Sequence, residues 1–128
     1  MFRSSHLLAV VMCLGLFTAC SAAESLPVVD DATFPASVAK DGTGNYTMTG
    51  NVTAHAGAGV AKIGIHLHPQ GAVVLQDAVV DVSTATSPYP IGIVIPGAVP
   101  AGTYTYDVSA TDKNAKVSAA LTKTVVLQ

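Results

Sequence analysis

The sequence predicts an all-β fold, a two-layer antiparallel β-sandwich of seven to eight strands. Hydrophobic and polar residues alternate with a period of two along most of the chain after residue 32. Turn-forming residues interrupt this alternation about every 8–12 residues, which is typical of sandwiches. No segment shows the spacing of apolar residues that an amphipathic helix needs. Short half-buried strands of this kind must cover one another, and two packed layers achieve that.

The first half of the domain contains three expected strands. Residues 33–38 form an edge strand, because Pro35 has no backbone N–H to donate to a neighbouring strand. After a glycine-containing turn, residues 46–54 alternate apolar side chains with threonine and asparagine, which predicts a strand with one solvated face. A second glycine-rich turn leads to a strand over residues 61–67, where isoleucine and leucine alternate with polar side chains and glycine.

The second half continues the same pattern. Residues 73–75 and 78–82 form two short strands, and residues 83–90 form a loop because they are polar and contain prolines. Longer alternating runs predict three further strands, over residues 91–95, 104–111 and 116–127. The last two of these are joined by a hairpin turn that contains aspartate and asparagine, which favour turns.

Parts of this strand pattern resemble bacterial immunoglobulin-like (Ig-like) domains. Residues 49–54 and 59–65 are similar to the second and third strands of that family. Residues 100–112 are similar to its penultimate strand, with a G-x-Y-x-hydrophobic-x-V-x-A run before a polar turn. The resemblance covers about residues 33–128 and implies an Ig-like antiparallel β-sandwich, in which Tyr104 occupies the position of a tyrosine corner.

The N-terminus predicts export from the cell. Arg3 supplies a positive charge, and residues 7–17 form an apolar run without charge. As a helix this run would be only about 16 Å long, which is too short to cross a hydrocarbon core of about 30 Å. Residues 1–19 are therefore expected to be a cleaved signal peptide rather than a permanent anchor.

The end of the signal segment resembles the bacterial lipobox, through Phe17-Thr18-Ala19-Cys20. This resemblance implies a lipoprotein-type signal peptide and lipidation of Cys20. The residue after the cysteine is serine and not aspartate. For this reason the resemblance further implies an outer-membrane lipoprotein of the cell envelope, held to the membrane by its N-terminal lipid. Cleavage after Ala23 is the alternative, and it would give a free periplasmic or secreted protein.

Composition limits the domain organisation and the partners. Residues 20–32 are small or acidic and are expected to be a flexible tether, and residues 33–128 form the single Ig-like domain. The expected domain contains no cysteine, so it has no disulfide and no cysteine-type zinc site. Acidic residues outnumber lysine and arginine, 8 against 6, and no basic patch is present. We therefore expect no nucleic-acid partner.

The clearest candidate site is the pair His66 and His68. Residues two apart on a strand share a face, so both imidazoles should project away from the core. Such a pair forms half of many zinc or copper sites. Asp107 is the expected third ligand, on a neighbouring antiparallel strand near Gly64 and diagonal to His66. His55 is excluded, because the strand spacing separates it from His66 by about 20 Å.

The sequence also bears on catalysis. It contains no G-x-S-x-G, Walker loop or H-E-x-x-H motif, and no nucleophile stands beside a base. We therefore expect a protein that is not an enzyme. The expected function is that of a non-catalytic, envelope-anchored binding or structural module, with an envelope protein or a polysaccharide as partner. We expect no cofactor for this module. The alternative is a periplasmic metal-binding protein that uses the H-x-H pair to bind zinc or copper.

Overall fold

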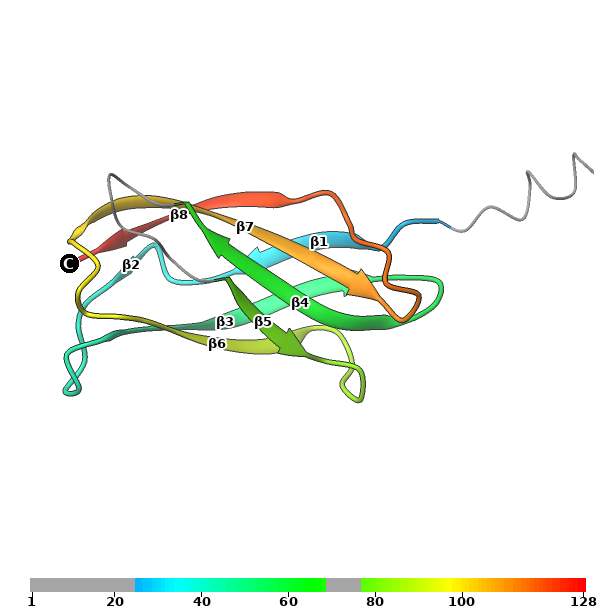
Figure 1. Cartoon of the computed structure of the whole chain (residues 1–128), viewed down its shortest axis with the longest axis horizontal. Coiled ribbons are helices and arrows are strands. Elements are labelled where there is room, and N and C mark those ends of the chain that lie inside the picture. The colour runs from blue at the N-terminus through cyan, green and yellow to red at the C-terminus, as the bar shows by residue number, and fades with distance from the viewer. Residues whose placement is uncertain (1–24, 69–76) are drawn as a thin grey trace, which may run out of the picture.

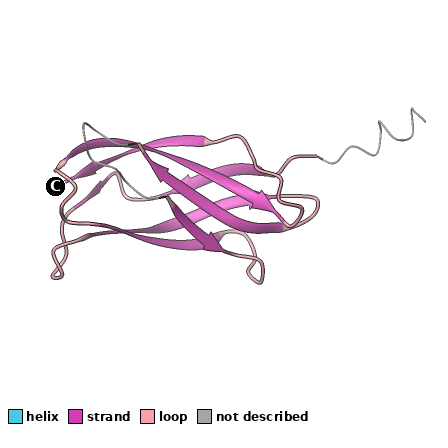
Figure 2. Cartoon of the chain, in the orientation of Figure 1, coloured by secondary structure: helices cyan, strands magenta, loops and turns pink. Residues whose placement is uncertain are grey.

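The computed structural model describes residues 25–68 and 77–128, and it confirms the all-β prediction (Figures 1 and 2). Within these residues there is no helix. None of them therefore forms a helix long and apolar enough to cross a membrane. In chain order the strands are β1 (Val28–Thr33), β2 (Ser37–Val38), β3 (Tyr46–His55), β4 (Val60–Leu67), β5 (Ala78–Asp81), β6 (Tyr89–Ile95), β7 (Gly102–Asp112) and β8 (Leu121–Leu127).

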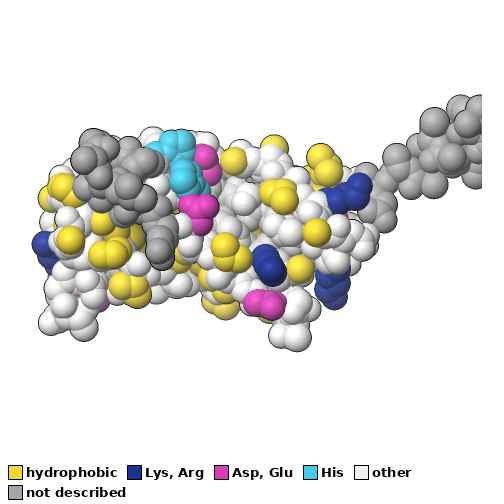
Figure 3. Space-filling view, viewed as in Figure 1, with side chains coloured by type: hydrophobic (Ala, Val, Ile, Leu, Met, Phe, Trp, Pro, Cys, Tyr) yellow, Lys and Arg dark blue, Asp and Glu magenta, His cyan; other side chains and the backbone are white. Residues whose placement is uncertain are grey.

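The strands form two sheets. One sheet has three strands in the order β1-β3-β6, and the other has five in the order β2-β8-β7-β4-β5. All neighbours pair antiparallel except β2 and β8, which pair parallel. Figure 1 shows β4, β5 and β7 crossing in front of the strands of the smaller sheet. Charged side chains are sparse on the face seen in Figure 3, as expected for a chain in which 11% of residues are charged.

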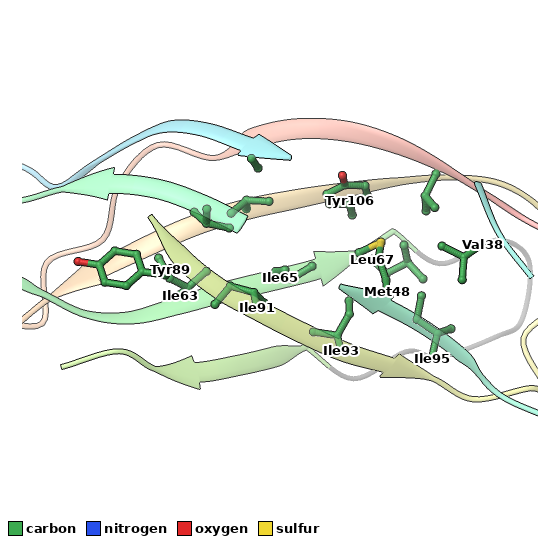
Figure 4. Packing of buried hydrophobic residues seen from close by; sticks show 14 of the residues in the cluster. Val38, Met48, Ile63, Ile65, Leu67, Tyr89, Ile91, Ile93, Ile95 and Tyr106 are labelled. Carbon is green, nitrogen blue, oxygen red and sulfur yellow. The ribbon is translucent and has the colours of Figure 1, made fainter. Parts of the chain in front are cut away.

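The alternation in the sequence explains which side chains are buried. In β6 every second residue is buried, and the residues between them are exposed. In β4 the side chains of Ile63, Ile65 and Leu67 are at most 6% exposed. Figure 4 shows these residues and the isoleucines of β6 packed into one core between the sheets. Burial of this apolar surface drives folding, and the described residues contain no cysteine that could add a disulfide.

Tyr104 adds a specific polar contact to this core. Its side chain is 1% exposed, and its hydroxyl donates a hydrogen bond of 2.7 Å to the carbonyl oxygen of Pro100. A buried hydroxyl without a partner would destabilise the fold, and this bond satisfies it. The same bond joins the loop before β7 to the beginning of that strand.

The N-terminal boundary of the domain differs from the prediction. The tether expected over residues 20–32 is wrong for its last five residues, which belong to β1. Ala32 is 3% exposed and pairs with Val52 of β3. The edge strand expected over 33–38 is interrupted, because the chain leaves the smaller sheet after Thr33 and joins β8 of the larger sheet through β2. Its two ends therefore belong to two different edge strands. Pro35 lies between the two strands and cannot donate to either sheet, which explains the break.

The first residues of two other strands also differ from the prediction. β6 begins at Tyr89, which is 6% exposed, so the end of the expected 83–90 loop is strand. β8 begins at Leu121, whereas a strand was expected from residue 116. The intervening residues lack an apolar alternation, and Val117 makes only an isolated bridge to β7 while remaining 52% exposed. The strand expected over 73–75 lies outside the described residues.

Two aspartates shape turns in the predicted places. The carboxylate of Asp41 accepts hydrogen bonds from the backbone and hydroxyl of Thr43 and from the hydroxyl of Thr47. These bonds stabilise the charged form and lower the pKa of Asp41 to about 2. Asp112 is 3% exposed and accepts bonds from the backbone N–H groups of Asn114 and Lys116 at 2.8 and 2.9 Å. It thereby closes the turn between β7 and β8.

Candidate functional site

The two histidines of the H-x-H pair project from the larger sheet as the sequence predicts. His66 lies in β4, and His68 follows the end of that strand. Because Ile65 and Leu67 face the core, both imidazoles face outward, and their side chains are 48% and 46% exposed. The ring centroids are 5.3 Å apart. Figure 3 shows the histidine side chains and acidic groups gathered at one place over this sheet.

Asp107 joins this pair from β7. It lies directly opposite His66 in the β4–β7 ladder, and its Oδ2 atom is 2.8 Å from Nε2 of His68. The prediction of Asp107 near Gly64 is wrong, because Gly64 pairs with Ser109. β4 and β7 are not joined by a tight turn that would set their register, and an irregularity between Val60 and Lys62 shifts it further.

Asp77 is a fourth residue beside His66, His68 and Asp107, and the sequence pattern did not point to it. Its Oδ1 atom contacts Nδ1 of His66. Asp77 stands immediately before β5, which returns antiparallel to β4 so that Ala78 pairs with Ile65. The adjacent position therefore brings Asp77 beside His66. Hairpin geometry could have found it, but only with the length of the loop between β4 and β5 known.

The site therefore consists of two histidine–aspartate pairs side by side, which we call the histidine–aspartate cluster: His66 with Asp77, and His68 with Asp107. The hydroxyl of Thr122 on β8 donates a 2.6 Å hydrogen bond to Oδ1 of Asp107. This bond and the one from His68 stabilise the carboxylate and lower the pKa of Asp107. Asp107 is thus a charged hydrogen-bond acceptor at neutral pH.

A groove of about 400 Å³ runs beside the cluster on the outer face of the larger sheet. We call it the outer-face groove; its lining includes Lys62, Gly64, His66, Asp77, Val79, Asp107, Ser109 and Val117. Gly64 leaves its floor open, since a Cβ there would lie 3.1 Å from Oγ of Ser109. Hydroxyl, carboxylate, imidazole and ammonium groups border the groove, so it offers both donors and acceptors to a polar ligand.

The structure brings His66, His68 and Asp107 together, but as parts of two separate pairs. In the described part of the chain, no group of three or more histidine, cysteine, aspartate or glutamate side chains has an arrangement that could hold a metal ion. The nitrogens that would bind an ion contact two different carboxylates instead of a common point. His55 lies on the smaller sheet, where its Nδ1 atom is 2.7 Å from Oδ2 of Asp30.

Other predicted positions have separate outcomes. Cys20, the expected lipidation site, lies outside the residues that the structure describes. Tyr104, which the sequence places at the position of a tyrosine corner, is a buried core residue. No protein-family model matches this sequence, and no curated protein matches it either. We therefore infer a function from the geometry of the histidine–aspartate cluster and the groove beside it.

Proposed function

We propose that this protein is a lipid-anchored, Ig-like module of the bacterial cell envelope that binds a partner without catalysing a reaction. The strand order of the two sheets supports an Ig-like β-sandwich, as does the division of the N-terminal segment between β1 and β2. The hydrogen bond from Tyr104 to Pro100, four residues upstream, has the form of a tyrosine corner. The apolar run over 7–17 and the sequence Phe17-Thr18-Ala19-Cys20 support export and lipidation.

The observation that carries the binding role is the position of the histidine–aspartate cluster at the outer-face groove. Charged and hydroxyl groups stand there on an exposed sheet face. His66, Asp107 and Ser109 lie within β4 and β7. His68 and Asp77 stand directly next to the ends of β4 and β5. Rigid elements position polar groups well for recognition. A partner rich in hydroxyl, amide or ammonium groups matches these donors and acceptors, which favours a polysaccharide or the polar surface of an envelope protein.

Crosslinking in living cells tests this role. A photo-reactive amino acid replacing Ser109 in the groove should capture a specific partner, while the same residue replacing Thr53 on the outer face of the smaller sheet should not. Asp107→Asn should weaken capture from the groove, because it removes the negative charge. Identical capture from both positions would refute binding at the groove. The intact mass of the membrane-extracted protein tests lipidation, and an unmodified Cys20 would refute the anchor.

A second candidate function is the binding of a divalent zinc or copper ion. The observation that favours it is Asp77, which adds a carboxylate to the two imidazoles and Asp107. An ion would need both histidine–aspartate pairs to open and turn toward one point. Zinc or copper titration by calorimetry tests this candidate with His66→Ala/His68→Ala, and His55→Ala is the matched control. Equal affinity in wild type and in the double variant would exclude the site.

A further inference from the structure

The two sheets together present four edge strands, β1 and β6 in the smaller sheet and β2 and β5 in the larger. An edge strand exposes unpaired N–H and C=O groups, and it pairs with other chains unless it is short, charged or distorted. The four edges can therefore be compared by how well each is protected. β6 is less protected than the other three edge strands.

Three edges carry protective features. β1 contains Asp30 and Asp31, and its register with β3 is irregular between Val29 and Asp31. β2 is only two residues long. β5 has four residues and ends in Asp81. Charges, irregularities and short length all oppose the addition of another strand to these edges.

β6 has none of these three features, and its one protective residue is Pro90, next to its start. It is seven residues long and contains no charged residue. Among the described residues, no strand pairs with its free side. Val94 is 64% exposed, and Gly92 beside it on the outer face has no side chain. The neighbouring outer face of β3 carries only uncharged polar residues next to this region, namely Thr47, Thr49 and Asn51.

The backbone of β6 is also oriented for pairing. Pro90 has no N–H, so it fits the ladder where its nitrogen faces away from β3. Because the direction of backbone groups alternates along a strand, the N–H and C=O groups of Gly92 and Val94 then also face the free side. After Val94 the next residue with this orientation is Pro96, which again has no N–H. Two prolines therefore bound a short pairing segment.

We propose that β6 is a dimerisation edge, which pairs antiparallel with β6 of a second copy. With Ile93 opposite its own counterpart, Gly92 lies opposite Val94 of the other copy. The exposed valine then packs over a position without a side chain, and about four main-chain hydrogen bonds form. Pro90 lies opposite Pro96 at each end, where no donor is lost. The result is a continuous six-stranded sheet with the isoleucines of both strands on one face.

A second copy fits this edge because the segment is complementary to itself. It carries no charge that would repel its own copy, and its small and large outer residues exchange places under the two-fold axis. The two-fold pairing also places the two domains side by side with their strands running in opposite directions. If the proposed lipid anchor holds, both anchors reach one membrane when the paired strands lie parallel to its surface.

Native mass spectrometry of the full chain in detergent tests the dimer. The wild type should give twice the mass of one chain, and Val94→Lys should give the mass of a single chain, because two lysines would approach across the axis. Val79→Lys is the matched control, since Val79 is 63% exposed on the protected edge β5. This variant should stay dimeric. Circular dichroism should show the same β signal in all three proteins.

Amide hydrogen exchange locates the contact. The N–H groups of Gly92 and Val94 should exchange slowly in the wild-type dimer and at least tenfold faster in Val94→Lys. A monomeric wild type at every concentration measured would overturn the proposal. A dimer that survives Val94→Lys, or one that leaves these two amides in fast exchange, would also overturn it.

Discussion

Removal of the Tyr104 hydroxyl should destabilise the domain through one identifiable bond. Tyr104→Phe keeps the ring, which is 1% exposed, in the core. It removes the 2.7 Å hydrogen bond to the carbonyl oxygen of Pro100. That carbonyl then loses its partner in a partly buried loop. The variant therefore isolates the contact that joins the loop before β7 to the strand.

The expected cost follows from the energetics of a single hydrogen bond. A typical intramolecular bond contributes about 0.5–1.5 kcal/mol, and an acceptor left without its partner adds to the loss. We expect the free energy of unfolding to fall by about 1–2 kcal/mol. With a denaturant slope of about 2 kcal/mol per molar urea, the unfolding midpoint should fall by about 0.5–1 M.

Urea unfolding followed by circular dichroism measures this change, and Tyr89→Phe is the matched control. Tyr89 is also buried, at 6% exposed, but its hydroxyl has no hydrogen-bond partner among the described residues. Its removal should change the free energy of unfolding by less than about 0.5 kcal/mol. Equal losses in the two variants would refute the reasoning, because ring burial alone would then explain both.

Three further outcomes test the close approaches and the turns. Gly50→Ala places a Cβ 2.0 Å from the carbonyl oxygen of Thr33, so β1 must move and the free energy of unfolding should fall by about 2 kcal/mol or more. Gly42→Ala is its control, because a Cβ there meets no atom within 4 Å, and urea unfolding should find a change below about 1 kcal/mol. The carboxyl of Asp41 should titrate near pH 2 by carbon NMR. Its contribution to stability is thus complete above about pH 4 and is lost as the pH falls toward 2, and a midpoint near 4 would contradict the turn geometry. Asp112→Ala leaves two backbone N–H groups without their acceptor, so thermal unfolding should show a loss of about 2 kcal/mol, whereas an unchanged midpoint would exclude this role.

Much of the strand pattern could be predicted because side-chain alternation is a local property. A residue in an extended chain faces the side opposite to its neighbour whatever the rest of the fold does. The buried faces of β3, β4, β6 and β7 follow from this rule alone. The same rule correctly turned His66 and His68 toward solvent. The hairpin turn at Asp112 was likewise readable from the residues that form it.

The position of β1 could not be predicted in this way. Its two adjacent aspartates resemble a solvated tether, and only pairing with β3 makes the segment a strand. One of these aspartates contacts His55, and the other lies 3.5 Å from Lys123. These partners are distant in sequence, so no local pattern reports them. The move of the chain from one sheet to the other between β1 and β2 has the same origin.

The amino-acid sequence by itself determined which side of β3, β4, β6 and β7 is apolar and where most of the turns between strands fall, since these depend on neighbours along the chain. The tertiary structure alone decided the register between β4 and β7, and hence that Asp107 lies opposite His66. It also brought Asp77 to His66 and left β6 at an edge. Register between strands that are not joined by a tight turn depends on loop lengths, bulges and the packing of the whole core.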